Sequence, residues 1–319
     1  MKIHSVLDME ITDNNLGNYI IMQSVRKNLR EIFPNDFFIK IPYLDDFGEN
    51  AMGYMKQSQK IFVGGTNALS AEMDKFKQIG LNEENSKLLN NKLILCGVGW
   101  WQYQEKINSY TANILHNALS KEYIHSCRDS YTVKKLREIG IENAVNTGCP
   151  TIWDLDEKHC KQIPTDKADE VIIGFTDYNQ RRTRDTQIME IIEKEYKNIY
   201  CWVQSPADFK YVSSLSSAVK FIAPNLEALE EFLDEHKHVD YVGTRLHAGI
   251  KCIQRLKRSI IIGIDNRAIE MGKDFGLVVL PEKELNQLAS MINAKWSTDI
   301  QIPQKQILQW KQQFLNEKK

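Results

Sequence analysis

An arginine and a histidine separated by one residue dominate the segment Tyr241-Val-Gly-Thr-Arg-Leu-His-Ala-Gly-Ile250. A strand-like run ends at Gly243 and Thr244, and an apolar helical pattern follows. Arg245 offers a planar fork to a carboxylate or phosphate, and His247 can exchange protons near neutral pH. In open parallel sheets, ligands bind where strands end, and helix N-termini there favour anions. We therefore predict that Gly243, Thr244 and Arg245 bind an anion and that His247 is a catalytic acid or base. The alternative is an ion-paired arginine and a hydrogen-bonded histidine.

A second basic residue follows another strand-like run. In Ser126-Cys-Arg-Asp-Ser130, Arg128 stands where the strand ends, and Asp129 is placed to cap the next helix. This is again a geometry that suits an anion. We predict that Arg128 binds an anionic ligand. The alternative is an ion pair at the surface between Arg128 and Asp129 or another carboxylate.

Polar, glycine-rich and aromatic segments mark further candidate ligand contacts. The polar residues follow the first strand, the paired glycines allow close backbone approach, and the tryptophans offer a stacking platform to a sugar ring. Helix capping, a tight turn and ordinary core packing are the alternatives for the three groups. The predicted ligand-contacting or cleft-lining residues are Asp13, Asn14, Asn18, Gly64, Gly65, Trp100 and Trp101.

Short apolar runs alternate with longer helical patterns, which predicts two Rossmann-like doubly wound α/β domains. Strands are predicted at Ile3–Ile11, Phe37–Ile41, Lys60–Val63, Leu93–Cys96, Tyr123–Ser126, Ala144–Asn146, Val171–Phe175, Ile199–Val203, Val219–Ala223, Val239–Gly243, Ser259–Ile264 and Leu277–Leu280. Helices are predicted near Gly17–Phe33, Ala71–Lys77, Glu83–Asn90, Thr111–Leu119, Ser130–Ile139, Thr186–Tyr196, Leu226–His236, Ala248–Leu256, Arg267–Asp274, Glu282–Asn293 and Gln304–Glu317.

The polar stretch Asp154–Glu170 carries Pro164 and has no clear periodicity, so we take it as the connection between the domains. We expect an N-terminal domain over residues 1–157 and a C-terminal domain over residues 165–319, whose last helix packs across both.

Composition excludes several classes of protein. Net charge is -1, from 41 basic and 42 acidic residues, so we expect no nucleic-acid partner. No apolar run reaches the roughly 20 residues of a membrane helix, and we expect no signal peptide. The six cysteines have no close pair, which indicates reduced thiols and a cytoplasmic protein. We expect no metal and no cofactor, since no ligand motif with metal-site spacing is present.

Taken in order, these motifs resemble the polysaccharide pyruvyl transferase family. The resemblance covers most of the chain, and it is strongest at Gly243-Thr-Arg-Leu-His-Ala-Gly249 and Arg128-Asp-Ser130. Further matches are Asp13-Asn14-x-x-Gly17-Asn18, Val63-Gly-Gly65, Gly97-x-Gly99 and Ile262-Gly-Ile-Asp265. The chain departs from the family where Thr66 replaces a third glycine and where Asn266-Arg267 replaces a common lysine. Whether Arg267 does the work of that lysine is left open.

The resemblance implies a fold similar to the GT-B glycosyltransferases, with the active site in a cleft between the domains. It implies phosphoenolpyruvate as donor and a sugar of a cell-surface polysaccharide or its precursor as acceptor. The product would be a pyruvate ketal, and the precursor could be borne on a membrane. On this basis Arg128, Arg245 and Arg267 are expected to hold the donor. The alternatives are a GT-B glycosyltransferase that uses a nucleotide sugar and a glycan or anion binder without catalysis.

Overall fold

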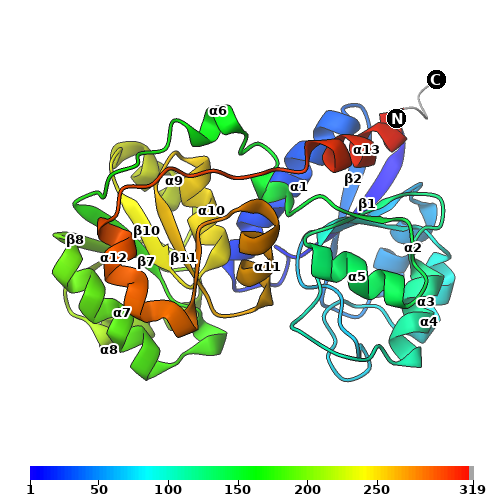
Figure 1. Ribbon diagram of the computed structural model, residues 1–319. Helices are drawn as coiled ribbons and strands as arrows, with labels where there is room; N and C mark the ends of the chain where they lie inside the picture. The colour runs from blue at the N-terminus through cyan, green and yellow to red at the C-terminus, as the bar shows by residue number, and fades with distance from the viewer. Residues whose placement is uncertain (316–319) are drawn as a thin grey trace. The chain divides into compact units, whose positions relative to one another are not determined.

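The structure, a computed structural model, describes residues 1–315. Its residues divide into two compact units (Figure 1). Unit 1 comprises Met1–Asp13, Ile21–Trp153 and the C-terminal segment from Ile302. Unit 2 comprises Asn14–Ile20 and Asp154–Gln301. Each unit holds one six-stranded parallel sheet with flanking helices, which confirms the predicted fold class of two Rossmann-like doubly wound domains.

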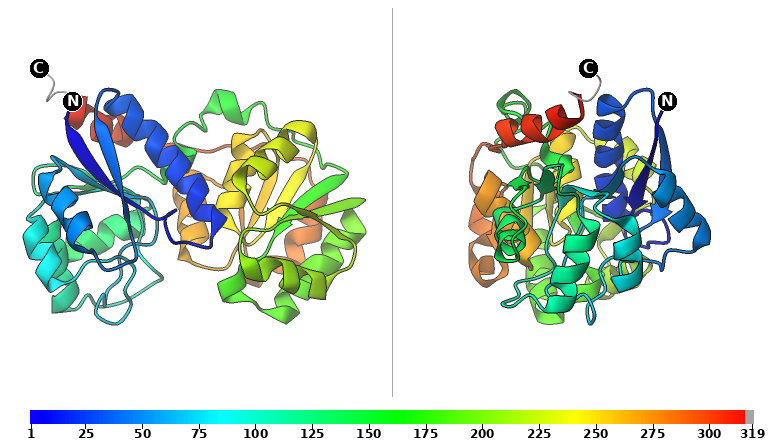
Figure 2. Two further views of the ribbon diagram at one scale, coloured as in Figure 1. Left: turned by 180° about the vertical axis from the view of Figure 1, so that it is seen from behind. Right: turned by 90° about the vertical axis from the view of Figure 1, so that its right-hand side faces the viewer.

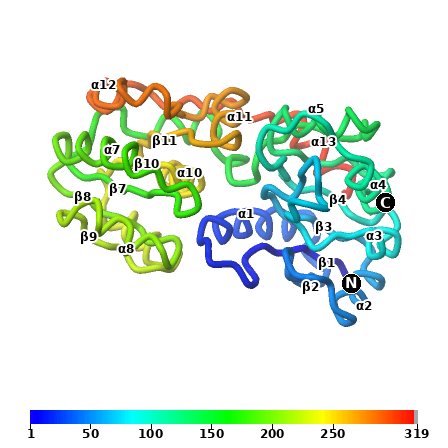
Figure 3. Tube along the Cα trace, turned by 90° about the horizontal axis from the view of Figure 1, so that it is seen from below, coloured from blue at the N-terminus to red at the C-terminus, as the bar shows by residue number. Residues whose placement is uncertain are grey.

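Unit 1 is built on a sheet with the strand order β2-β1-β3-β4-β5-β6. Figure 3 shows β2, β1, β3 and β4 following one another in this order. The strand β2 lies on one side of β1 and the later strands lie on the other side. The switch point, at which the strand order reverses, is therefore between β1 and β3, as in flavodoxin-like folds. The strands are β1 (Ile3–Asp8), β2 (Phe37–Pro42), β3 (Ile61–Gly64), β4 (Leu93–Val98), β5 (His125–Cys127) and β6 (Ala144–Asn146). The helices are α1 (Leu16–Ile32), which begins in unit 2, α2 (Glu49–Gln57), α3 (Glu83–Leu89), α4 (Ser109–Ala118), α5 (Ser130–Glu138) and α13 (Gln304–Leu315), with a 3₁₀ turn η1 (Pro150–Ile152).

Unit 2 has the strand order β12-β11-β10-β7-β8-β9, which is that of a dinucleotide-binding Rossmann sheet. Its switch point lies between β7 and β10. The strands are β7 (Glu170–Gly174), β8 (Asn198–Trp202), β9 (Val219–Ile222), β10 (Asp240–Gly243), β11 (Ser259–Gly263) and β12 (Val279–Pro281). The helices are α6 (Glu157–Cys160), α7 (Arg182–Glu195), α8 (Pro206–Leu215), α9 (Leu226–Glu235), α10 (Leu246–Gln254), α11 (Asn266–Phe275) and α12 (Leu288–Asn293), with 3₁₀ turns η2 (Asp177–Asn179) and η3 (Glu282–Gln287).

Strands buried on both faces explain the near-continuous apolar runs in the sequence. In unit 2, alternate side chains of β7 and β11, such as Ile173 and Ile262, join a core cluster with Ile188 of α7 and Leu288 of α12. The intervening side chain, Ile261, contacts α10 on the other face. The sheet is therefore held rigidly between two helix layers, and its strand ends are fixed points for side chains.

A buried arginine closes the amino end of the unit 2 sheet. Arg258 Nη1 donates to Asp240 Oδ2 at 2.9 Å, while Nη2 donates to carbonyl oxygens at the end of α12, including those of Ile292 and Ala294, both at 2.9 Å. The guanidinium also lies over the ring of Trp296, 4.4 Å from its centroid. These contacts satisfy helix-end carbonyls that have no partner within the helix. Arg258 therefore has a structural role.

Helix α5 illustrates how local sequence fixes an element. The carboxylate of Asp129 caps it by accepting from Thr132 N at 2.7 Å, and Leu136 faces the core. Gly140 ends it with a φ of +78°, and Ile141 N donates back to Leu136 O. The predicted cap is confirmed, and the left-handed glycine explains where the helix ends.

Every predicted strand is present, but the helices are predicted less well. The predicted helix at Ala71–Lys77 is wrong, because its backbone bonds elsewhere: Ala71 N donates to Gln104 and Met73 N to Thr111. The helices α2, α6 and α8 were not predicted. For α8, Pro206 follows the capping residue Ser205 and starts the helix, a position where proline is favoured.

The C-terminal helix belongs to unit 1. In α13, Trp310 and Phe314 lie against Phe62 with ring centroids 6.4 and 5.6 Å away, and Lys311 pairs with Glu31 of α1. Figure 2 shows α13, in red, beside α1, in blue. This differs from the predicted domain of residues 165–319, because aromatic side chains of unit 1 supply the apolar surface that α13 needs. Residues 316 and 317 of the predicted helix lie outside the described residues.

Candidate functional site

Arg245 of unit 2 occupies the N-cap of α10, directly after β10 and beside the switch point of the sheet. Two neighbours fix this turn. A side chain at Gly243 would lie 2.5 Å from the carbonyl of Gly174 in β7, so only glycine lets the strands approach. Thr244 N donates to Gly174 O, and the Thr244 hydroxyl contacts Thr176 Oγ1 at 2.9 Å. The hydroxyl of Thr244 thus ties β10 to the loop after β7.

The guanidinium of Arg245 is surrounded by oxygen atoms and is only 5% exposed. Two carboxylates contact it: Asp208 Oδ1 at 2.7 Å and Asp177 Oδ1 at 3.2 Å. Neutral oxygens complete its contacts, from Phe175 O at 2.8 Å, Ser205 Oγ at 3.2 Å and Asn15 Oδ1 at 3.4 Å. The structure therefore shows the ion-paired arrangement, in which one cation faces two carboxylates.

The two carboxylates differ in how firmly they are held. Asp208 is buried at the start of α8, where its oxygens also accept from Ser205 and from Gln204 N at 2.9 Å. The Asp177 side chain is 20% exposed and belongs to the short turn η2. An incoming anion can therefore replace Asp177 at lower cost than Asp208.

His247 lies in the first turn of α10, two residues after Arg245, and is 8% exposed. The hydroxyl of Tyr241 donates to Arg245 O at 2.8 Å and secures the same turn. Burial raises the pKa of Tyr241 well above its usual value, so this hydroxyl stays protonated. The motif thus holds the arginine and histidine on one rigid turn.

Arg267 is a second arginine at the same edge of unit 2. It lies in the first turn of α11, where Asp265 is the cap; Arg267 Nε donates to Asp265 Oδ2 at 3.0 Å, and Nη2 contacts the same oxygen. The phenol of Tyr178, next to Asp177 in η2, also bonds to Arg267 Nη2. The turn η2 therefore contacts Arg245 through one residue and Arg267 through the next.

Arg128 of unit 1 follows β5 and is 1% exposed. Its Nε donates to Asp129 Oδ2 at 3.1 Å and its Nη1 to Asn67 Oδ1 at 2.7 Å. Among residues 1–315, Nη2 has no hydrogen-bond partner. A side chain at Gly99 would lie 2.1 Å from Arg128 Cζ, so the guanidinium packs directly on this glycine. Unit 1 thus presents a buried cation with an unused N–H group.

The glycine pair after β3 serves packing. A side chain at Gly64 would meet Met22 Sδ at 2.6 Å, and one at Gly65 would meet the carbonyl oxygen of Gly97 at 2.8 Å. The turn that follows carries Asn67, which holds Arg128. Close packing at these glycines therefore fixes the turn that carries Asn67, and Asn67 in turn holds the guanidinium of Arg128.

The structure corrects the expected aromatic platform. Trp100 is 0% exposed and its Nε1 donates to Gln104 Oε1 at 2.9 Å, so its ring is not available for stacking on a sugar. Trp101 is half-buried beside the exposed ring of Phe76, with ring centroids 4.8 Å apart. Trp101 therefore keeps an accessible aromatic surface, and Phe76 extends it.

The predicted polar residues near the N-terminus are divided between the units. Asp13 is half-buried in unit 1, whereas Asn14 is exposed and Asn18 half-buried in unit 2. The cap of α1 is Asn15, whose Oδ1 accepts from Gly17 N at 3.0 Å. Capping thus accounts for Asn15, and the roles of the other three stay predictions.

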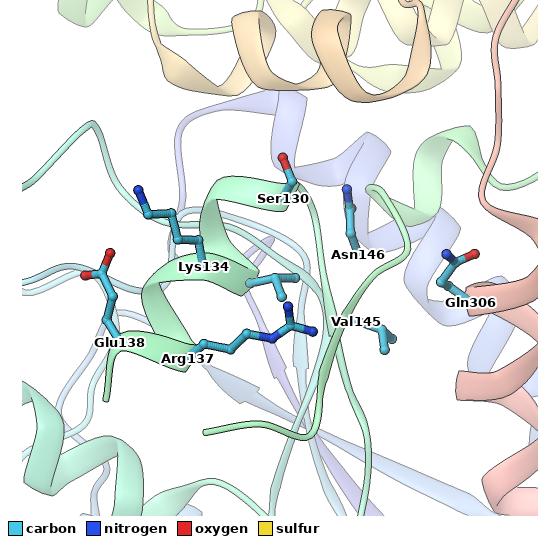
Figure 4. A pocket seen from close by; sticks show the side chains of 8 residues that line it. Ser130, Lys134, Arg137, Glu138, Val145, Asn146 and Gln306 are labelled. Carbon is cyan, nitrogen blue, oxygen red and sulfur yellow. The ribbon is translucent and has the colours of Figure 1, made fainter. Parts of the chain in front are cut away.

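A shallow groove of about 640 Å³ lies on unit 1 (Figure 4). Ser130 of the Arg-Asp-Ser motif lines one end, and Lys134 and Arg137 of α5 supply two cations, offset in part by Glu138. None of the predicted donor or catalytic residues lines it. The groove therefore lies beside the motif and does not contain Arg128.

The sequence profile of the family described as "polysaccharide pyruvyl transferase" matches residues 15–266, most of the chain. The chain belongs to the polysaccharide pyruvyl transferase family. The match includes Arg128, Arg245 and His247, and it ends one residue before Arg267. No curated protein matches the chain.

Solved structures show a similar fold. The S. aureus MnaA–UDP co-structure aligns with 99% of this chain and 97% of its own, at 9% identity and a TM-score of 0.52. The UDP-GlcNAc 2-epimerase from Neisseria meningitidis, bound to UDP-GlcNAc, aligns with 99% of this chain and 100% of its own, at 12% identity and a TM-score of 0.47. At these identities the likeness concerns the fold alone.

Two further observations concern residues 1–315. No group of three or more histidine, cysteine, aspartate or glutamate side chains in this part of the chain is placed to hold a metal ion. None of the helices there is both long and apolar enough to span a bilayer.

Proposed function

We propose that this transferase moves the pyruvyl group of phosphoenolpyruvate onto a sugar of a cell-surface polysaccharide or its precursor. The family match over residues 15–266 is the observation that carries the proposal. Family membership supports polysaccharide pyruvylation in general. Phosphoenolpyruvate as the donor and a ketal as the product are the finer parts of this proposal.

The donor carries a carboxylate and a phosphate, and desolvating either anion without a cationic partner is costly. We assign these groups to Arg128 and Arg245, with Arg267 as a third cation. Arg128 supports this assignment best, since its buried Nη2 has no partner among the described residues. For Arg245, the donor replaces Asp177 as the second anionic partner.

In the proposed reaction, a sugar hydroxyl attacks C2 of phosphoenolpyruvate while C3 gains a proton. The C2–O bond to phosphate then breaks, and a second hydroxyl of the sugar attacks C2 to close the ketal. One hydroxyl proton ends on the new methyl group, and the other leaves with phosphate. We assign His247 to these proton transfers, for which a positioned acid or base contributes about 10²–10⁴-fold.

The acceptor sugar is assigned to residues of both polar and aromatic type. We propose that Trp101 stacks on a sugar ring and that Asp13, Asn14 and Asn18 bind its hydroxyls. We expect the reaction in the cytoplasm, where the six buried thiols of the chain stay reduced.

The test is phosphate release from phosphoenolpyruvate in the presence of candidate glycans, followed by mass analysis of the glycan product. His247→Ala should lower the rate by about 10²–10⁴-fold, whereas His238→Ala, at an exposed residue of the same unit, should not. An unchanged rate in His247→Ala would reject the assigned role. Stabilisation by UDP but not by phosphoenolpyruvate would instead favour a nucleotide-sugar glycosyltransferase.

A further inference from the structure

Gln204 has a buried side chain that the structure does not use. It follows β8 at the carboxyl edge of the unit 2 sheet, where Gln204 N donates to Asp208 and Gln204 O accepts from Leu16 N at 3.0 Å. The residue is 1% exposed, yet Nε2 has no hydrogen-bond partner within residues 1–315. A buried donor left unpaired costs about 1–3 kcal/mol. A group of this kind calls for an explanation.

The neighbours of this amide place it beside Arg245. A carbon built on Gly174, at the end of β7, would lie 3.2 Å from each of three atoms: Gln204 Nε2, Arg245 Cγ and Tyr241 Oη. The amide nitrogen and the Arg245 side chain therefore border the same small space, and Asp208 links the two residues because its carboxylate accepts from Gln204 N and from Arg245 Nη2. This point is next to the switch point between β7 and β10, where open parallel sheets bind ligands.

The surrounding oxygens are already engaged. Asp208 accepts from Gln204 N, Ser205 and Arg245, and the Tyr241 hydroxyl donates to Arg245 O. Within the described chain, Gln204 Nε2 thus finds no acceptor. A neutral N–H group next to a guanidinium suits an oxyanion, since the cation supplies charge and the amide adds a directed hydrogen bond.

We propose that Gln204 Nε2 donates a hydrogen bond to a carboxylate or phosphate oxygen of the substrate held by Arg245. This assignment deepens the proposed function and rests on it for the identity of the donor substrate. Gln204 is then a specificity-determining residue. Its amide distinguishes a ligand that presents an acceptor oxygen at this point from one that does not.

The first test is Gln204→Met, which keeps the length of the side chain and removes the N–H group. Because Nε2 makes no hydrogen bond within the described structure, the unfolding temperature should stay equal or rise. The kcat/KM for phosphoenolpyruvate should fall about 10-fold or more, the effect of one hydrogen bond to a charged group. Gln204→Glu places an anion at this point and should lower kcat/KM for phosphoenolpyruvate further.

A matched control is Thr298→Val in the same unit. The hydroxyl of Thr298 is also buried without a partner in the described part of the chain. It lies near the C-terminal end of α11, where Asp299 O approaches Gly276, whereas the candidate site is at the opposite end of that helix. Thr298→Val should match Gln204→Met in stability and leave kcat/KM unchanged.

A binding measurement separates this inference from the proposed function. Thermal unfolding of wild type and Gln204→Met is followed with phosphoenolpyruvate, inorganic phosphate or pyruvate. If inorganic phosphate stabilises wild type but not the variant, Gln204 binds the phosphate group of the substrate. If pyruvate stabilises wild type but not the variant, Gln204 binds the carboxylate. If wild type shows Gln204-dependent stabilisation but never releases phosphate, the proposed function fails and the Gln204 assignment holds.

Two results would overturn the assignment. The first is equal kcat/KM in wild type and Gln204→Met together with equal stabilisation by all three probes, in which case pyruvyl transfer can still stand. The second is a wild-type protein that none of the three probes stabilises and that shows no turnover, which removes both proposals.

Discussion

The two units carry buried arginines at comparable strand ends but satisfy them differently. Arg128 of unit 1 faces one carboxylate, from Asp129, and keeps an N–H group without a partner among residues 1–315. Arg245 of unit 2 faces two carboxylates, from Asp208 and Asp177. A substrate anion can therefore add to Arg128, whereas at Arg245 it must replace a resident carboxylate. Equivalent motif positions thus imply different binding energetics.

The largest expected effect is on stability. Arg245→Met leaves the buried carboxylate of Asp208 without its cation, which should lower the free energy of unfolding by about 3–5 kcal/mol. Arg128→Met removes the cation from one buried carboxylate, that of Asp129, whereas Arg245→Met removes it from Asp208 and also from Asp177, so the loss in Arg128→Met should be smaller by about 1 kcal/mol. Urea unfolding of the full chain measures both. Equal losses in the two variants would contradict the difference between the units.

The second prediction concerns acid sensitivity of unit 1. His125, in the strand β5 that Arg128 follows, is fully buried, and burial lowers its pKa to about 4 although Ser120 O accepts from its ring. Between pH 6.5 and about 4 the unfolded chain binds more protons than the folded one, so the free energy of unfolding falls as pH falls through this window. The loss from this residue should be about 3 kcal/mol.

His125→Gln isolates this contribution, since glutamine keeps a donor for Ser120 O and does not titrate. The variant should be less stable than wild type at pH 7 but should lose less stability between pH 6.5 and 4. His4 also has its pKa lowered, chiefly by burial, and stays in both proteins, so the difference reports His125 alone. Parallel pH profiles of wild type and variant would show that His125 is not the group responsible.

The sequence predicted the strands and the fold class better than the contacts within the candidate site. Alternating apolar runs predicted every strand, and the Arg245 turn was recognised because its glycine, arginine and histidine have fixed spacing. The state of Arg245 was not predictable, since Asp177 and Asp208 come from separate loops that only the folded sheet brings together. Gln204 belongs to no motif; its position after a strand was the only signal, and many strand ends share it.

A third prediction tests the unused N–H group of Arg128. Arg128→Lys keeps the charge but cannot reproduce the planar fork that contacts Asp129 and Asn67. We expect kcat/KM for phosphoenolpyruvate to fall about 10–100-fold, the equivalent of one or two charge-assisted hydrogen bonds. Steady-state phosphate release measures it. Arg137→Lys on the exposed side of α5 is the matched control, and a similar fall there would remove the special role of Arg128.

The smallest effect tests the exchange at Arg245. Asp177→Asn keeps the size of the side chain and removes the charge that competes with the substrate. Because the Asp177 side chain is partly exposed, its pairing with Arg245 should be worth about 1 kcal/mol, so the KM for phosphoenolpyruvate should fall roughly 5-fold. The same change at Asp166, an exposed residue of unit 2, should leave KM unaltered. A raised KM in Asp177→Asn would mean that Asp177 supports substrate binding. The substrate would then not replace Asp177 at Arg245, and the proposed difference between the two units would be wrong.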